Sequence, residues 1–289
     1  MIVVSGEALI DMTPSGFAAE HGYIPRLGGS PYNVAVALGR LEVPVAFLGR
    51  LSRDFFGQRL RTHLVSTGVN VSYLSDGREP STLAFVSLEA GREADYAFWT
   101  ENSADRNLKP HDLPSGFDDH VVALHFGSLS LVLEPIATTL EMLMYRERGN
   151  RVIVLDPNVR PRLISDKETY RVRIENWVRR ADVVKGSRAD LAWLYPDDSF
   201  ERSARSWLAM GPSLVIVTLV VDTVGAGDAF SAAMLAWLHK RGRLRRDLLP
   251  ELSSENLAQL LTFANHEAAM ACGYAGADAP YRSKVPTPL

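Results

Sequence analysis

The sequence predicts an α/β protein in which helices cover both faces of a mostly parallel central sheet. Short apolar runs alternate with helical patterns along the 289 residues, and one interval breaks this alternation with consecutive β-rich runs. Alternating strands and helices form βαβ units, whose parallel strands require a helical layer on each face. We therefore expect three layers, α/β/α, with a small second sheet.

Apolar runs rich in Val, Ile and Leu predict the buried strands of the central sheet. The strands are expected at residues 2–10, 45–51, 121–126, 151–155, 182–185 and 213–219. Helical patterns lie between and after these runs. The helices are expected at residues 32–41, 55–66, 135–148, 167–180, 191–195, 200–210, 227–241 and 254–272.

The interval that breaks the alternation predicts a β lid. Residues 82–88 and 94–99 are β-rich and flank a polar turn, which is typical of an antiparallel hairpin, and residues 17–27 form a weaker third strand. We expect this lid to comprise about 12–27 and 80–105 and to exclude water from a site beneath it. Without a linker rich in Gly, Pro or Ser, residues 1–289 are expected to form a single domain.

Composition excludes several functional classes. The chain has 31 basic and 34 acidic side chains, and a net charge of −3 argues against a nucleic-acid partner. The lone Cys272 permits no internal disulfide, which favours a reducing compartment. The N-terminal residues lack a signal-peptide pattern, and no run approaches the ~20 apolar residues of a membrane span. We expect a cytoplasmic protein without a membrane partner.

Polar residues follow several predicted strands. Asp11 comes after the first strand, and residues 156–160, 185–187 and 225–228 come after three later ones. Ligands of parallel sheets bind beyond the carboxyl ends of the strands. We therefore expect all four to lie at one functional rim.

Residues 221–230 carry the strongest functional pattern, because Gly225 and Gly227 precede Asp228 where a strand gives way to a helix. Free amides at a helix N-terminus suit an anion, and an acid beside a bound phosphate suits a base that deprotonates an attacking hydroxyl. The pattern indicates a kinase of small alcohols. An ordinary strand-to-helix turn, in which Asp228 only compensates the helix dipole, fits the same short motif.

A second pattern opens the first predicted helix. Gly28 and Gly29 allow a ligand to approach the backbone, and the amide of Asn33 could match a sugar hydroxyl, although a well-capped helix has the same pattern. Asp11 could chelate a pair of hydroxyls or simply solvate the end of a strand.

Together these motifs resemble those of the ribokinase-like carbohydrate kinases, the PfkB family. Residues 222–230 resemble its C-terminal signature, residues 28–33 with matching positions in 49–57 its N-terminal one, and residues 263–269 a further family segment. The resemblance covers nearly the whole chain in the right order. It implies a ribokinase-like fold, small-molecule sugar and ATP as partners, and Mg²⁺ arriving with the nucleotide.

The resemblance also implies a role for individual residues. Asp228 would be the base, and the anion hole for the γ-phosphoryl group would be formed by the amides of Gly225, Ala226 and Gly227. Sugar hydroxyls would be held by Asp11, Gly29 and Asn33. ATP would be held by Lys185, Ser187, Thr218, Gly225, Gly227 and Asn265. A monovalent cation such as K⁺ would lie near Asp222 and Thr223.

Helical spacing adds an expectation for the residue assigned to adenine. Asn265 shares a helix face with Leu261 and Ala258, so we expect it to point inward rather than to solvent. A buried asparagine that satisfies a neighbouring polar group is the alternative.

Within the family, three segments look most like the fructokinase branch. They are residues 6–11, 96–106 and 155–160. Phe98 would then lie over the sugar, with Arg106 and Arg160 at its border. The same arginines could pair with the carboxylate of a sugar acid, as in 2-keto-3-deoxygluconate kinases. A non-catalytic sugar-binding protein of this fold is the third alternative.

The sequence departs from the family pattern at three places. Residues 187–190 lack the usual Asn-x-x-Glu, and an arginine common within residues 272–277 is absent. Between Leu219 and Val220 a family β-hairpin of roughly ten or more residues is missing. It is either deleted or left out of the sequence, and the continuous numbering leads us to favour omission. An exposed lid edge also favours pairing with a second copy of the chain.

Overall fold

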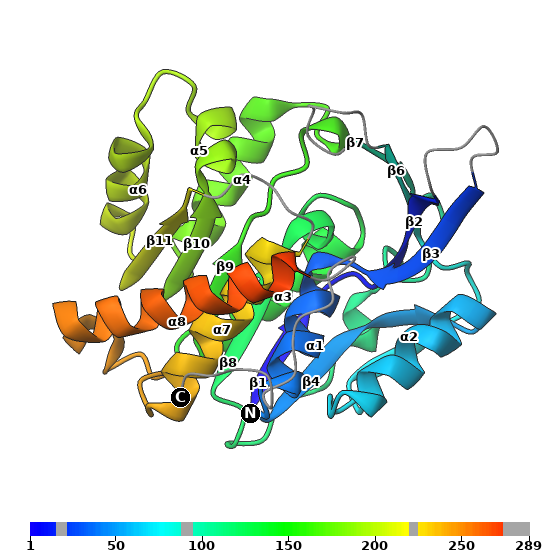
Figure 1. Ribbon diagram of the computed structural model, residues 1–289, viewed down its shortest axis with the longest axis horizontal. Coiled ribbons are helices and arrows are strands. Elements are labelled where there is room, and N and C mark those ends of the chain that lie inside the picture. Colours follow the sequence, from blue (N-terminus) through cyan, green and yellow to red (C-terminus); the bar gives the residue numbers. More distant parts are fainter. Residues whose placement is uncertain (16–21, 88–94, 220–224, 274–289) are drawn as a thin grey trace.

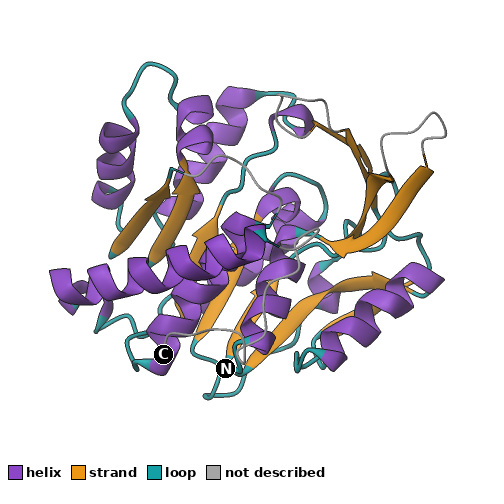
Figure 2. Cartoon of the chain, viewed as in Figure 1, coloured by secondary structure: helices purple, strands orange, loops and turns teal. Residues whose placement is uncertain are grey.

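A seven-stranded sheet lies between two helical layers (Figures 1 and 2). The computed structural model describes residues 1–15, 22–87, 95–219 and 225–273. In spatial order the strands are β11 (Leu214–Thr218), β10 (Val183–Ser187), β9 (Val152–Asp156), β8 (Ala123–Gly127), β1 (Ile2–Ser5), β4 (Val45–Ser52) and β5 (Leu74–Gly77). Each neighbouring pair is parallel, which confirms the predicted α/β/α architecture.

Two apolar cores form because consecutive strand residues point to opposite faces of the sheet. Val4 and Val154 belong to the core under α1 (Ser30–Arg40), α2 (Phe55–Ser66), α7 (Ala226–Lys240) and α8 (Ser254–Cys272). Val3 and Ile153 belong to the core under α3 (Ile136–Glu147), α4 (Lys167–Val178), α5 (Arg188–Leu194) and α6 (Phe200–Ala209). None of the described helices is both long enough and apolar enough to cross a bilayer.

The first predicted strand is two strands in the structure, which corrects the expected span of 2–10. The chain breaks at Gly6, whose φ of 151° is a conformation that side chains rarely adopt. A Cβ at Gly6 would also lie 2.5 Å from the Pro31 side chain. β1 stays in the central sheet, whereas β2 (Leu9–Ser15) leaves it.

The second sheet has the order β3-β2-β6-β7, where β3 is Gly22–Gly28, β6 is Leu83–Ser87 and β7 is Asp95–Trp99. The antiparallel pairing of β6 with β7 confirms the predicted hairpin, and its polar turn lies outside the described residues. The weak strand expected at 17–27 is β3, and β2 joins the sheet unexpectedly. That this sheet acts as a lid stays a prediction.

Close packing of α1 against α7 brings the N-termini of the two helices together. The buried face of α7 carries small side chains, including Ala232, Ala233 and Ala236, each of which is fully buried. Small residues let neighbouring helices approach closely, and Figure 1 shows α1 and α7 side by side. The N-terminal turns of α1 and α7 consequently lie at the same edge of the sheet.

We predict that Gly39→Ala destabilises the fold, because a Cβ at this position of α1 would overlap the carbonyl oxygen of Thr67. The free energy of unfolding, measured by urea denaturation, should fall by about 1–3 kcal/mol. Gly116→Ala is the matched control, since a Cβ there meets nothing within 4 Å. Equal stabilities of the two variants would contradict the packing described here.

Candidate active site

Asp228 lies in the first turn of α7 and is held by the first turn of α1. Its side chain is only 7% exposed. Ser30 Oγ donates to Oδ1 at 2.6 Å, and Asn33 Nδ2 donates to Oδ2 at 2.8 Å. Both carboxylate oxygens are thereby fixed by an element that is distant in sequence.

The environment leaves Asp228 able to act as a base near neutral pH. Burial raises the pKa of Asp228 to about 6, against the hydrogen bonds from Ser30 and Asn33, which lower it. The charge of Asp156 adds to the rise, and that of Lys185 opposes it. At pH 7 the carboxylate is therefore mostly ionised, yet it is a better proton acceptor than an exposed aspartate.

The residues just before Asp228 form a turn suited to an anion. Gly225 is the N-cap of α7 in the left-handed conformation, with φ 87°, and its carbonyl accepts the first helical bond, from Ala229 N. The next N–H groups, beginning with Ala226 and Gly227, have no intrahelical partner. A Cβ at Gly227 would lie 3.1 Å from Lys185 Nζ, so an ammonium group flanks these amides.

A buried ion pair between Lys185 and Asp156 lies next to this turn. Lys185 Nζ lies 3.0 Å from Asp156 Oδ2, to which Ser231 Oγ also donates at 2.9 Å. Burial alone would lower the pKa of Lys185, but nearby carboxylates, led by Asp156, raise it, so the ammonium stays charged. The sequence analysis expected Asp156 at the functional rim without giving it an individual role, and it did not single out Ser231. The signals were an acid at the end of β9 and a serine three residues after Asp228, on the same helix face.

Asp11 faces the same site from the small sheet. It lies within β2, opposite Arg26 of β3 and Ala84 of β6, which corrects its expected place after a strand of the central sheet. Its Oδ2 occupies the space that a Cβ of Gly28 would need. Burial, then the charge of Asp228, raises the pKa of Asp11 to about 7.

Gly29 and Glu7 join the small sheet to the start of α1. Gly29 has φ 106°, and a Cβ there would lie 2.9 Å from the carbonyl oxygen of Glu7. The Glu7 carboxylate is buried and accepts hydrogen bonds from Ser130 N and Oγ. Burial raises the pKa of Glu7 to about 7. Apart from the place of Glu7 in the segment 6–11, nothing in the sequence predicted that it would lie next to Gly29.

The residues predicted to surround the sugar each contact other parts of the protein. Arg160 is close enough to Asp11 for its charge to lower the pKa of that carboxyl, and its Nη1 donates to Asn158 Oδ1 at 2.6 Å. Phe98 stacks on Tyr96 with ring centroids 5.8 Å apart and packs against the small apolar cluster of Leu9, Ala84 and Leu129. Arg106 donates through Nε to the carbonyl of Glu134 at 2.9 Å.

The predicted nucleotide side lies at the carboxyl ends of β10 and β11, where Ser187 and Thr218 are register partners. The Ser187 side chain caps α5 in a reciprocal pair with Asp190. Asp190 Oδ1 also accepts from Val159 N at 2.8 Å, so the departure from Asn-x-x-Glu serves local structure here. The assigned ATP contacts of Ser187 and Thr218 stay predictions.

The expected inward orientation of Asn265 is wrong. Asn265 and Ala258 are exposed, and Leu261 is 38% exposed. The buried face of α8 is carried instead by residues that include Phe263 and Ala264. The three residues do share one face, but periodicity alone does not tell which face the core covers. The predicted cation residues Asp222 and Thr223 lie outside the described residues.

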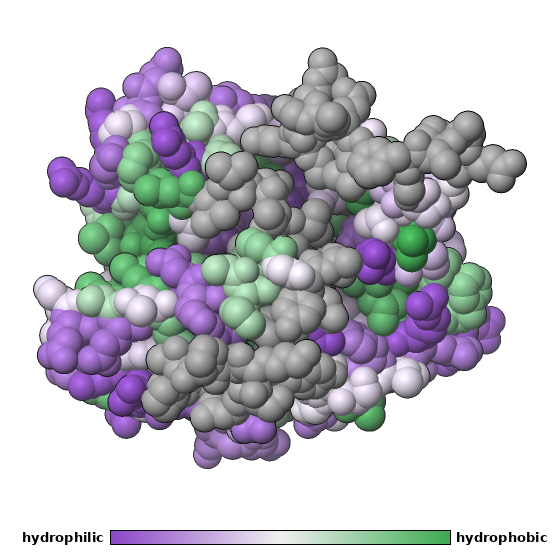
Figure 3. Space-filling view, in the orientation of Figure 1, coloured by the Kyte–Doolittle hydropathy of each residue, from purple (hydrophilic) through white to green (hydrophobic). Residues whose placement is uncertain are grey.

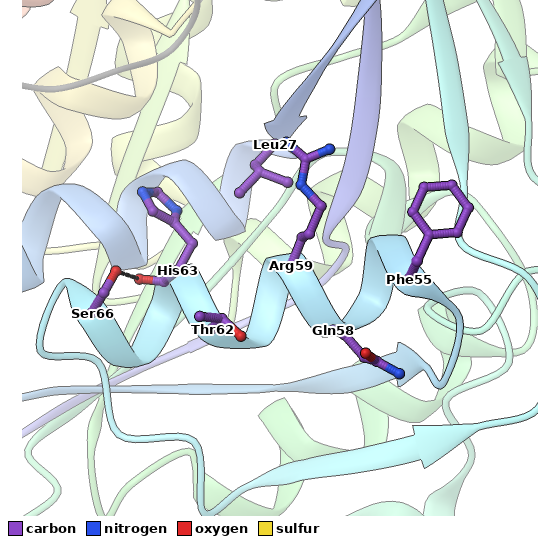
Figure 4. Close-up of a pocket in the computed structure, with 7 residues that line it drawn as sticks. All are labelled: Leu27, Phe55, Gln58, Arg59, Thr62, His63 and Ser66. Carbon is purple, nitrogen blue, oxygen red and sulfur yellow. Dashed lines mark hydrogen bonds between the residues drawn. The ribbon is translucent and has the colours of Figure 1, made fainter.

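A groove of about 580 Å³ along α2 is separate from this site (Figure 4). It is lined by Leu27, Phe55, Gln58, Arg59, Thr62, His63 and Ser66. The residues around Asp228 are not among those that line it. The chemistry described above therefore belongs to the rim of the central sheet rather than to this groove.

β11 is the edge strand of the central sheet in the described part of the chain, and α7 begins shortly after it. No described residue between the two elements is in a strand. Figure 3 shows apolar side chains at the surface on this side of the molecule, and Leu219 is 60% exposed. That a family hairpin is missing after Leu219 stays a prediction, because residues 220–224 lie outside the described residues.

We predict that the buried acids make stability fall as pH rises. Glu7, Asp11 and Asp228 have raised pKa values in the fold, so the unfolded chain releases their protons at lower pH. The free energy of unfolding should then decrease between about pH 5 and pH 8. The free energy of unfolding is measured by urea titration at pH 5 and at pH 8. In Glu7→Gln the difference between the two values should be smaller by ~1–2 kcal/mol. The exposed Glu101→Gln is the control, and an unchanged slope in Glu7→Gln would refute the assignment.

Comparisons with known proteins identify the family of this chain. The model of the pfkB family of carbohydrate kinases matches residues 1–219 and 212–284, two segments that overlap at 212–219, which contains β11. A fructokinase of Rhizobium leguminosarum bv. trifolii is 39% identical over 280 residues, covering 89% of this chain and 85% of the relative.

Solved structures extend the similarity to the fold. A fructokinase with bound ATP from Xylella fastidiosa has a TM-score of 0.86 at 27% identity, covering 96% of this chain and 93% of that one. A fructokinase from Vibrio cholerae O395, bound to fructose, ADP and calcium ion, has a TM-score of 0.82 at 28% identity, covering 96% and 94%. Because the family model matches nearly the whole chain and the fold agrees with these solved structures, the chain belongs to the pfkB family of carbohydrate kinases.

Proposed function

We propose that this protein is an ATP-dependent fructokinase. The observation that carries the proposal is the placement of Asp228 at the N-terminus of α7, with each carboxylate oxygen held by a donor of α1. Relatives that share the whole fold are named fructokinases, and one was solved with fructose and ADP bound. These similarities support fructose as the acceptor.

The reaction needs one proton transfer and one phosphoryl transfer. The Asp228 carboxylate takes the proton of a sugar hydroxyl as that oxygen forms a bond to the γ-phosphorus of ATP. The bond from the γ-phosphorus to the bridging oxygen breaks, and ADP leaves with that oxygen. Asp228 afterwards returns its proton to solvent. Asp11, Gly29 and Asn33 are proposed to hold the sugar, with Phe98 over it and Arg106 and Arg160 at its border.

Charge on the moving phosphoryl group is stabilised by groups that are already in place. The amides of Gly225, Ala226 and Gly227 point beyond the helix, and Lys185 adds a positive charge beside them. We propose that ATP is held there and along Ser187, Thr218 and the exposed face of α8 at Asn265.

Mg²⁺ is proposed to enter the site together with the nucleotide. The described residues contain no cluster of three or more Asp, Glu, His or Cys side chains that could form a metal cage. This fits Mg²⁺ that is carried mainly by nucleotide phosphates, where it would neutralise their charge. K⁺ near Asp222 and Thr223 is proposed from the family resemblance alone.

A neutral sugar fits the site better than a sugar acid. The two arginines that suggested a carboxylate ligand already donate hydrogen bonds, Arg160 to Asn158 and Arg106 to the Glu134 carbonyl, and the charge of Arg160 acts on Asp11. An added carboxylate would also approach the partly buried Asp11 and the buried Asp228, both of which have raised pKa values. The balance of charge therefore favours fructose over a keto-sugar acid.

The compartment and the self-association of the protein are proposed as well. The chain has a single cysteine, Cys272, and therefore no internal disulfide, which fits a cytoplasmic protein. A second copy of the chain is proposed to pair through the small sheet, where Tyr23 and Trp99 are 46% and 61% exposed.

We predict that fructose gives the highest kcat/KM in an assay of ADP release with ATP and Mg²⁺. The panel should include ribose, 2-keto-3-deoxygluconate and adenosine, each at matched concentrations. A preference for the sugar acid would replace fructose by the alternative acceptor. Sugar binding by calorimetry without ADP release on any member would favour a non-catalytic binding protein.

We predict that Asp228→Asn lowers kcat by roughly two or more orders of magnitude, because the amide cannot accept the hydroxyl proton. Fructose affinity, measured by calorimetry, should stay within about threefold. Asp182→Asn is a matched control. Asp182 is similarly buried and accepts two hydrogen bonds, but it directly precedes β10 and so lies at the amino-terminal ends of the strands, away from Asp228. Near-normal turnover in Asp228→Asn would remove this residue from the proposed role.

A further inference from the structure

The hydroxyl of Ser30 has a specific place beside Asp228. Ser30 is the first residue of α1 and is 7% exposed, as Asp228 is. Its Oγ donates to Asp228 Oδ1 at 2.6 Å across 198 positions of sequence. Among the described residues it is the hydrogen-bond donor to Oδ1, whereas Asn33 serves Oδ2.

The backbone fixes Ser30 in this position. Gly29, directly before it, has φ 106° and fits closely against the carbonyl of Glu7. Pro31, directly after it, occupies an early position of α1, where its fixed φ suits the first helical turn. The backbone conformation at Gly29 and Pro31 therefore places the serine hydroxyl next to Asp228.

We propose that Ser30 is a positioning residue of the phosphoryl transfer: with Asn33 it grips the two oxygens of Asp228 separately and orients the carboxylate toward the sugar hydroxyl. The proposal rests on the proposed function and deepens it. Without Ser30, the carboxylate would keep its bond to Asn33 alone and could turn about the Cβ–Cγ bond.

The charges around the base give the hydroxyl a second effect. The charged groups that face Asp228 are Asp11 from β2, Asp156 from β9 and Lys185 from β10, while α1 presents neutral donors. Two of these charges oppose ionisation of Asp228. A donor to the ionised carboxylate favours that form, and the Ser30 bond does lower the pKa of Asp228 against the effect of burial. Removing the hydroxyl should make the base harder to ionise.

The test is the pH dependence of Ser30→Ala, a substitution that keeps the helical start of α1. We expect the acidic limb of kcat for fructose, near pH 6 in the parent protein, to move up by roughly one pH unit. The plateau of kcat should fall by about 3–10-fold because orientation is lost. KM for fructose and ATP should stay within about twofold.

A second measurement does not depend on turnover. In protein labelled with ¹³C at aspartate carboxyls, the Asp228 signal is identified by its loss in Asp228→Asn, and its titration should shift upward in Ser30→Ala. Ser203→Ala is the matched control, because Ser203 is buried and donates to the carbonyl of Ser199 on α6. It should leave both readouts unchanged.

An unshifted carboxyl titration in Ser30→Ala would overturn the inference, whatever the level of activity. A uniform loss of kcat with an unmoved acidic limb would also overturn it, since that result indicates a structural role only. Absence of fructose phosphorylation by the parent protein would instead refute the proposed function, and the carboxyl titration would still decide the role of Ser30.

Discussion

The contact between the first turn of α1 and Asp228 of α7 is the interaction on which the site depends. It joins segments that are far apart in sequence and places an acid where two helix N-termini meet. The alanine-rich face of α7 makes this approach possible, because larger side chains would hold the helices apart. The packing of α1 against α7 therefore determines where the Asp228 carboxylate lies.

The same arrangement collects negative charge in a buried place. Glu7, Asp11 and Asp228 all have raised pKa values, and burial is the largest cause for each. The compensating cations are Lys185, whose charge lowers the pKa of Asp228, and Arg160, whose charge lowers that of Asp11. Such an arrangement costs folding free energy but creates a proton acceptor with a pKa near the working pH. Its retention is best explained by chemistry rather than by stability.

Much of the fold could be predicted because local signals were strong. α2 and α8 begin and end where expected, since Asp54 and Ser253 cap their N-termini. The short strand β5 was missed because Leu74–Gly77 has no apolar run, and it depends on pairing with β4. The break at Gly6 was missed because both strands that flank it are apolar, and only the second sheet reveals that they diverge.

The sequence by itself determined which residue types stand at the rim: an acid after glycines at the start of α7, and glycines before Ser30 and Asn33 at the start of α1. These motifs are local, and their backbone requirements are visible in the chain. Only the tertiary structure decided that Ser30 and Asn33 both bond Asp228, that Asp11 reaches the site from the small sheet, and that Asn265 is exposed. Periodicity tells which residues share a face, but the packing of distant elements determines what that face meets.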